Sequence, residues 1–234
     1  MARLHARSSI GNEPSDVAIE TVAHRGDGVF TILISALALL FSGYSLWESS
    51  LKAPALEVFV PPVIHYTSPY NNTNFEVIQV PVTILNDGGR TGTVLSMRLE
   101  ATNTKTKEKK NFYAADFGRW SMEKTRNLSY EPFAPMPLAG KASRTETILF
   151  YTKGPEEKPD QLIREPGTYH FRLILDEATS EGFGFLDRFG VRGPAEVSFD
   201  MDLREYDARA FQVGTLPLYS TSGQSAKSTN QEPH

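Results

Sequence analysis

The chain has 234 residues, a length that suits one domain with additional segments. It carries 24 Lys and Arg against 28 Asp and Glu, a net charge of -4, and this balance argues against a nucleic-acid-binding protein, for which a basic surplus is typical. No Cys is present, which excludes disulfides, thiol nucleophiles, cysteine-ligated zinc and iron–sulfur clusters. The composition, 40% hydrophobic and 22% charged, is that of a globular protein.

The N-terminal part of the chain predicts a flexible tail followed by a transmembrane helix. Residues 1–28 show no clear apolar periodicity, whereas residues 29–47 carry no charge at all. At a rise of 1.5 Å per residue this run forms a helix of about 28 Å, close to the hydrocarbon thickness of a bilayer. Apolar residues lie all round it, and Tyr44 and Trp47 sit near one end, where aromatic rings favour the membrane interface. We therefore expect a membrane-spanning helix over 29–47 and a linker over 48–54 rather than a buried core helix.

A cleavable signal peptide is the main alternative to a retained anchor. Ala53-Pro54-Ala55 places small residues at the spacing of a processing site. However, the apolar run is longer than the roughly 7–15 residues of a cleavable segment, and Ala53 lies well beyond its end. The leading tail, with four acidic residues, also differs from the basic start of a signal peptide. The sequence favours an uncleaved signal-anchor and leaves cleavage open.

The charges flanking the helix give a weak orientation signal. Arg25 precedes the apolar run and Lys52 follows it, so the nearest positive charges are tied. Arg3 and Arg7 tip the balance toward a cytoplasmic N-terminus, and a large domain without Cys suits an oxidising compartment. We predict a single-pass protein with its N-terminus in the cytoplasm and its C-terminal domain in the periplasm or outside the cell.

Small and hydroxyl residues recur along one face of the predicted helix. In a bilayer such a stripe permits the close approach of a second helix, because no hydrophobic force drives helices together there. The stripe predicts lateral association with a protein partner or with a second copy. The alternative is that the hydroxyls bond back to carbonyls of their own helix. The six residues are Gly28, Thr31, Ser35, Ala38, Ser42 and Ser45.

The rest of the chain predicts about seven β-strands, most of which alternate apolar and polar residues with the period of two that a half-buried strand requires. Residues 78, 80, 82 and 84 form one apolar face, as do residues 95, 97, 99 and 101, with Val94 as an outlier. Residues 169, 171, 173 and 175 form another, and so do 197, 199, 201 and 203. The expected strands are 56–60, 63–67, 75–86, 91–103, 145–151, 167–176 and 196–203.

Turn residues suggest how the first long strands connect. Asp87-Gly88-Gly89-Arg90 separates strands 75–86 and 91–103, and this spacing predicts that the two form a β-hairpin. Pro81 has no N–H to donate, so it indicates an edge position or a bulge. Residues 113–141 read as a long irregular insertion, and residues 214–234 as a disordered tail.

Several antiparallel strands without an amphipathic helix predict a mainly β fold, an antiparallel β-sandwich over residues 55–213. The stretch V-P-V-T-I-L-N-D-G-G-R-T-G (residues 80–92) resembles the strand and turn of bacterial cell-surface immunoglobulin-like modules. P-G-T-Y-H-F-R-L (residues 166–173) is similar to a strand that such domains carry late in their fold. The resemblance implies an immunoglobulin-like sandwich, although the disulfide and core Trp of antibody domains have no counterpart here, and it implies no function.

Motifs of catalysis and of cofactor binding are absent from the sequence. It contains no G-x-G-x-x-G, P-loop, G-x-S-x-G or H-E-x-x-H. Ser-x-x-Lys occurs at residues 49–52 and 121–124, which is near what composition gives by chance. We predict no enzymatic activity, no catalytic residue and no cofactor.

The candidate metal ligands of the sequence do not predict a metal site. His65 and His170 belong to the predicted domain, and two separated histidines are more often surface residues than ligands. Acidic residues at 176, 177, 181 and 187 would offer oxygens to Ca²⁺, but their spacing fits no known loop and a solvated turn explains them equally. The basic run 105–110 is read as a soluble hairpin tip.

One predicted loop contains three phenylalanines, although aromatic residues are rare in solvated turns. Phe183, Phe185 and Phe189 lie in a glycine-rich, charged stretch between two predicted strands. They predict either a contact site for a partner or a lid that folds back on the open end of the sandwich.

Three functions follow from these patterns, in order of preference. The first is a membrane-anchored, non-enzymatic interaction or assembly module whose β domain lies outside the membrane. The second is an accessory subunit of a membrane complex, held by lateral contacts of its transmembrane helix. The third is an exported enzyme or metal-binding protein, which the missing motifs disfavour.

Overall fold

The computed structural model describes residues 27–68, 75–119, 131–154, 157–178, 195–205, 207 and 215–228. The chain divides into two units, Met1–Gly43 and Tyr44–His234, which are described separately. The predicted tail 1–28 lies outside the described residues except for its last two positions, which are helical.

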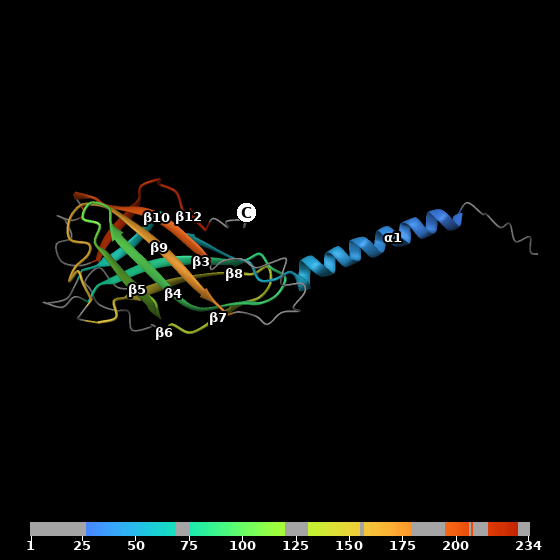
Figure 1. The fold of residues 1–234 in the computed structure, drawn as a ribbon, viewed down its shortest axis with the longest axis horizontal. Helices are drawn as coiled ribbons and strands as arrows, with labels where there is room; N and C mark the ends of the chain where they lie inside the picture. The colour runs from blue at the N-terminus through green and yellow to red at the C-terminus, as the bar shows by residue number, and fades with distance from the viewer. Residues whose placement is uncertain are drawn as a thin grey trace, which may run out of the picture. The chain divides into compact units, whose positions relative to one another are not determined.

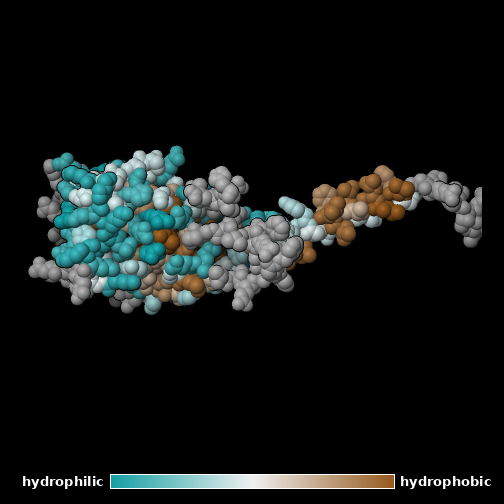
Figure 2. Space-filling model, in the orientation of Figure 1, coloured by the Kyte–Doolittle hydropathy of each residue, from teal (hydrophilic) through white to brown (hydrophobic). Residues whose placement is uncertain are grey.

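The N-terminal helix is confirmed and begins two residues earlier than predicted. Helix α1 spans Asp27–Leu46 and continues as the π-helical turn η1, Trp47–Leu51. It contains no Pro, and its commonest residue is Leu, which an α-helix accommodates well. Its large apolar side chains are 46–74% exposed on every side, which gives α1 the continuous hydrophobic surface of Figure 2. Among the described residues, Gly28–Leu51 is the one stretch that is long and apolar enough to cross a membrane.

The described residues of the second unit form twelve strands after the end of α1 and η1, and every pairing between these strands is antiparallel. Figure 1 shows their arrangement. In chain order they are β1 (Leu56–Val60), β2 (Val63–Thr67), β3 (Val77–Asn86), β4 (Gly92–Asn103), β5 (Lys109–Phe117), β6 (Glu131–Pro132), β7 (Met136–Leu138), β8 (Ser143–Tyr151), β9 (Gly167–Glu177), β10 (Glu196–Leu203), β11 (Thr215–Ser220) and β12 (Ala226–Lys227).

Eight of these strands close into a barrel. The pairings run in a ring from β3 through β2, β11, β10, β9, β4, β5 and β8 back to β3, while β1, β6, β7 and β12 are additions to it. The closing strand is β8, which pairs with β3 along one edge and with β5 along the other. A sandwich needs two sheets with separate edges, and a barrel has none. The predicted immunoglobulin-like sandwich, and with it the resemblance to surface immunoglobulin-like modules, is therefore wrong.

The predicted alternation is confirmed in the strands that line the barrel interior. The apolar faces of β3, β9 and β10 are all buried, and the rings of Phe171 and Phe199 stack across the β9–β10 pair at 5.5 Å. A sandwich and a barrel impose the same alternation on a strand, since each has one inner and one outer face. Periodicity alone therefore predicts the buried residues correctly while leaving the closure undecided.

In β4 the predicted inner face is corrected at its first position. The register between β4 and β9 shifts between Val94 and Ser96, which marks a β-bulge. Because a bulge inserts one residue, Val94 points into the core and is fully buried, whereas Leu95 points outward and is 47% exposed. Val94 looked like an outlier because the alternation was counted across the bulge.

The predicted hairpin between β3 and β4 is also wrong. β3 pairs with β1, β2 and β8, whereas β4 pairs with β5, β7 and β9. The turn after β3 therefore crosses from one side of the barrel to the other. Pro81 fits the edge-like position expected of it, since β2 pairs with residues 77–79 of β3 and β1 with residues 83–86, and Pro81 lies between those stretches.

Two predicted irregular segments contain strands. β5 ends and β6 and β7 lie within the expected insertion 113–141, and β11 and β12 lie within the expected disordered tail 214–234. β11 is short and ends in Ser-rich sequence, so composition conceals it, yet Leu218 is fully buried in the core. Its place between β2 and β10 makes it a member of the closed ring.

Candidate functional site

The segment that follows α1 is built into one end of the barrel through glycines. Residues 48–55 lie against the turn after β3, and this turn also lies against the turn between β7 and β8, which contains Gly140. A Cβ atom on Gly88 would lie 2.2 Å from the Ala53 carbonyl oxygen, and one on Gly140 would lie 2.1 Å from the Gly89 carbonyl oxygen. A Cβ on Gly89 would lie 2.8 Å from the backbone of Ser49. Three backbone segments therefore touch without side chains between them, and we call this arrangement, residues 48–55, 86–90 and 138–142, the glycine joint.

Backbone hydrogen bonds hold the layers of the glycine joint together. The N–H groups of Gly89 and Arg90 both donate to the Lys52 carbonyl, each at 3.0 Å. The Asp87 N–H donates to the Ala55 carbonyl at 2.8 Å, and the Lys141 N–H donates to the Gly88 carbonyl at 3.0 Å. These bonds satisfy backbone groups that the close packing removes from water.

Asn86, the last residue of β3, is the central side chain of the glycine joint and is fully buried. Its Oδ1 atom accepts hydrogen bonds from the N–H groups of Ala55 at 3.1 Å and Gly88 at 2.9 Å. Its Nδ2 atom donates to the carbonyls of Arg90, Leu138 and Ala139 at 2.8–3.2 Å. One amide therefore connects all three backbone segments. The amide of Asn or Gln carries two N–H donors and a carbonyl acceptor on one planar group, which suits this position.

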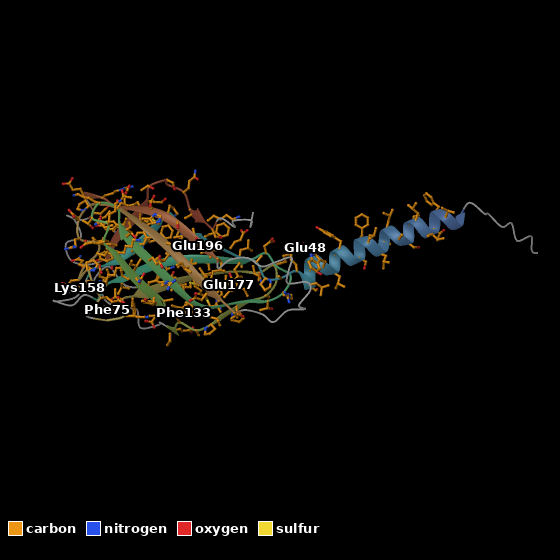
Figure 3. The ribbon with its side chains drawn as sticks, in the orientation of Figure 1. Glu48, Phe75, Phe133, Lys158, Glu177 and Glu196 are labelled. Atoms are coloured by element: carbon orange, nitrogen blue, oxygen red, sulfur yellow. The ribbon has the colours of Figure 1, made fainter. Side chains whose placement is uncertain are left out.

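Four charged side chains cover the glycine joint. The ammonium group of Lys141 donates to carboxylate oxygens of Glu48 and Asp87, and that of Lys52 donates to Glu48 at 2.8 Å and to Asp87 at 3.3 Å. The hydrogen bond from Lys141 and then that from Lys52 hold the pKa of the Glu48 carboxyl below its usual value, and the same two lysines lower the pKa of Asp87. The carboxylates in turn raise the pKa of Lys141. Figure 3 labels Glu48 at this end of the barrel.

The residues of the predicted helix stripe are exposed along α1 as expected for a lipid-facing or helix-facing surface. The hydroxyl of Ser35 donates to the carbonyl of Thr31 at 2.8 Å, so this hydroxyl bonds within its own helix. The packing of a second helix on the stripe stays a prediction. The predicted partner loop with Phe183, Phe185 and Phe189 lies outside the described residues.

The structure does not bring the two domain histidines together. His65 lies on β2 and His170 on β9, with β11 and β10 between them in the sheet. Nδ1 of His170 is 2.6 Å from a carboxylate oxygen of Asp200, whereas burial lowers the pKa of His65. Within the described ranges, no group of three His, Asp or Glu side chains has the arrangement of a metal site.

The other sequence candidates have structural partners. Asp176 accepts a hydrogen bond from the Ser96 hydroxyl across the β4–β9 pair, and residues 181 and 187 lie outside the described residues. The amine of Lys52, from the first Ser-x-x-Lys match, contacts carboxylates rather than Ser49, and the second match is likewise undescribed. In the basic run 105–110, Lys110 is not a solvated residue of a hairpin tip, because it is buried on β5.

The linear pattern of the sequence does not reveal the glycine joint. It identified Asp87–Arg90 as a turn, but nothing in a linear pattern shows that Asn86 and Gly140 face the same backbone. The available signal was the pair of adjacent glycines, since one glycine suffices for most turns and a second indicates close backbone approach.

Comparisons with known proteins give little further information. No protein-family model and no curated protein matches the sequence. A crystal structure described as the ApaA protein from Bordetella pertussis aligns with 73% of this chain and 98% of its own length, at 12% identity and a TM-score of 0.31. A likeness at that level indicates nothing about function.

Proposed function

We propose that this protein is a membrane-anchored, non-enzymatic interaction or assembly module, in which the apolar helix stays attached and the β-barrel is presented outside the membrane. The observation that carries the proposal is the glycine joint. It makes the residues directly after α1 part of the folded domain, so the helix and the barrel function as one chain rather than as a leader and its product.

The contacts of Ala55 argue against processing at the Ala-Pro-Ala site. Its side chain is 4% exposed, its N–H donates to Asn86 and its carbonyl accepts from Asp87. Cleavage after Ala55 would remove the Lys52 carbonyl that accepts two N–H groups, together with Glu48 and its ion pairs. The barrel would then keep two glycines, Gly88 and Gly89, facing no partner backbone, and several polar groups of the glycine joint would lose their hydrogen bonds.

A mass measurement tests retention of the helix. We expect the membrane fraction to contain the protein at its full mass of 26.0 kDa, and extraction at alkaline pH to leave it in the membrane. The double variant Leu37→Arg, Leu40→Arg should release it, because each charge at the centre of a span costs about 2.5–3.5 kcal/mol of insertion free energy. Leu95→Arg, on the exposed outer face of β4, is the matched control and should stay membrane-bound. A soluble product that begins near residue 56 would overturn the proposal.

The polar outer surface of the barrel supports its exposure to water. On the face formed by β4, β9 and β10 (Figure 1), Arg172 contacts Glu196 at 2.5 Å and Glu100 at 3.7 Å. Figure 2 shows hydrophilic residues over most of the visible barrel surface. Such a surface suits a compartment where partners approach through water.

We propose that this compartment is the periplasm or the cell exterior, with the N-terminus in the cytoplasm. Protease added to spheroplasts should then degrade the barrel and leave an N-terminal tag intact. Loss of the tag with protection of the barrel would reverse the orientation. A cytoplasmic marker protein, intact throughout, controls for lysis.

The second candidate, an accessory subunit held by lateral helix contacts, rests on the exposed small-residue stripe of α1. Substituting both Ser35 and Ser42 by Leu should abolish association in an in-membrane dimerisation or co-purification assay, because bulk at these positions keeps a second helix away. The control is Leu33→Ile and Leu40→Ile, which changes shape off the stripe. Unchanged association in the serine double variant would leave the helix as an anchor alone.

A further inference from the structure

A buried ion pair lies at the end of the barrel opposite the glycine joint. The Nζ atom of Lys110 on β5 is 2.5 Å from Oε2 of Glu76, the residue before β3, and the two side chains are 1% and 0% exposed. Since β3 separates Glu76 from Asn86, the pair and the glycine joint lie at opposite ends of one strand. Two charges removed from water lose their hydration, so such a pair persists only where further hydrogen bonds compensate.

The compensating bonds come from Tyr66 on β2 and from one segment, residues 157–166, which we call the strap. Oε1 of Glu76 accepts hydrogen bonds from the hydroxyl of Tyr66 at 2.6 Å and from the N–H of Leu162 at 3.0 Å. Lys110 donates to the carbonyl of Asp160 at 3.3 Å. Each member of the ion pair therefore holds the backbone of the strap as well as its partner.

The strap completes the barrel core without belonging to any strand. Leu162 and Ile163 are fully buried among the core side chains, while residues 157–166 connect β8 to β9 outside the sheet. The outer contacts of the strap are exposed ion pairs, Arg164 with Glu108 at 2.8 Å and Glu165 with Lys105 at 3.8 Å. A further pair, between Lys158 and Asp160, lies within the strap, with side chains 74% and 71% exposed. Exposed pairs of this kind contribute little to stability. Figure 3 shows Lys158 at the end of the barrel away from Glu48.

We propose that the Glu76–Lys110 pair is a latch that holds the strap closed over this end of the barrel, and that the strap opens as a unit while the barrel stays folded. Opening withdraws Leu162 and Ile163 from the core and uncovers the apolar interior. The device is local because the strands are joined by continuous ladders of hydrogen bonds, whereas the strap is held by the latch, by two apolar side chains and by single side-chain contacts. One of these is the hydrogen bond from the Tyr169 hydroxyl to the Glu165 carbonyl at 2.7 Å, and another is the bond from the Gln161 amide to the Tyr66 hydroxyl at 3.3 Å. Segments with few such contacts open with a smaller free energy than the whole domain.

Amide hydrogen exchange on the full chain in detergent micelles tests the latch. In the unmodified protein we expect the Leu162 and Ile163 amides to exchange by an opening that is insensitive to low urea concentrations, whereas core amides of β9 and β10 exchange by a urea-sensitive opening. Because this measurement needs no variant, it holds even where a substitution impairs folding. Identical urea dependence for the strap and the core strands would overturn the proposal.

Substitution of the latch gives the second measurement. Lys110→Met keeps an unbranched side chain one atom shorter and removes its charge, and it should speed exchange at Leu162 and Ile163 about tenfold or more relative to β9. Lys158→Met is the matched control, because it removes an exposed charge from the same strap and should leave those two amides unchanged. Equal acceleration in both variants, or acceleration spread evenly over the barrel in Lys110→Met, would contradict a latch.

Discussion

Asn86 shows how one buried polar side chain decides the geometry of a junction. Its amide makes five hydrogen bonds to three backbone segments, and no charged or apolar residue of similar size provides both donors and acceptors. At the start of the same strand Glu76 has an equivalent position, joining β2, β5 and the strap. Both ends of the barrel are therefore organised by a fully buried polar residue.

Asn86→Asp should destabilise the barrel strongly although it changes only one atom. A carboxylate there would face the carbonyl oxygens of Arg90, Leu138 and Ala139, so three attractive contacts become repulsive. We expect a loss of about 3 kcal/mol or more in the free energy of unfolding, measured by urea denaturation. Asn111→Asp, on the exposed face of β5, is the control and should change it by about 0.5 kcal/mol or less. Equal effects of the two substitutions would contradict the role of Asn86.

Lys141 controls the acid sensitivity of the glycine joint. Because the pKa values of Glu48 and Asp87 are lowered in the folded state, their ion pairs contribute stability above the usual pKa values and lose it as the pH falls through the lowered ones. Lys141→Met should raise both pKa values toward 4.5 and 3.8, so that this contribution is lost at a higher pH. NMR titration of the two side-chain carboxyl carbons measures the shift. Lys109→Met, an exposed lysine on β5, should leave both titrations unchanged.

At the scale of elements, the connection from β3 to β4 has two structural roles. It crosses the barrel, and it also receives residues 48–55 against its backbone. A hairpin turn would need only one glycine with the right dihedral angles, whereas this connection needs glycines whose missing side chains make room for another backbone. The close approach explains why two adjacent glycines follow Asp87 and why Gly140 lies beside them.

Gly140→Ala should therefore destabilise the protein, since its Cβ would overlap the backbone of Gly89, which has no flexible side chain to move aside. We expect a loss of about 1–3 kcal/mol in thermal or urea unfolding. Gly154→Ala is the matched control, because a Cβ there meets nothing within 4 Å. A tolerated Gly140→Ala would show that the three backbone layers separate easily.

At the scale of the whole molecule, the fold depends on strands that come late in the chain. β11 pairs with β2 along Thr215–Tyr219 of the register and with β10 at Met201 and Asp202, so it joins the first part of the domain to the last. β12 then adds to β1, and the Ser228 hydroxyl accepts from the N–H of Val58 at 3.0 Å. The C-terminal segment is thus a structural part of the barrel.

Truncation tests this closure directly. A chain that ends at residue 214 should fail to give a cooperative unfolding transition, because β2 and β10 lose their common neighbour and Leu216 and Leu218 leave the core. A chain that ends at residue 228 should unfold like the full chain. Circular dichroism during heating distinguishes them. Cooperative unfolding of the shorter chain would mean that the barrel closes without β11.

The local pattern of the sequence determined the apolar helix, seven of the strands and the buried faces of most of them, because each of these depends on a periodicity that neighbouring residues carry by themselves. It also marked Pro81 as a residue for an edge-like position, and this residue pairs with Thr147 of β8 on one side while lying between the stretches that pair with β1 and β2 on the other. Tertiary structure alone decided that β8 closes a barrel, that β3 and β4 do not pair although a turn connects them, and that β11 is a strand. Those outcomes depend on which distant strands pair, and alternation is the same for any partner. For the same reason, the glycines of the joint and the charges of Glu76 and Lys110 can be read in the sequence, but only the fold shows which groups they contact.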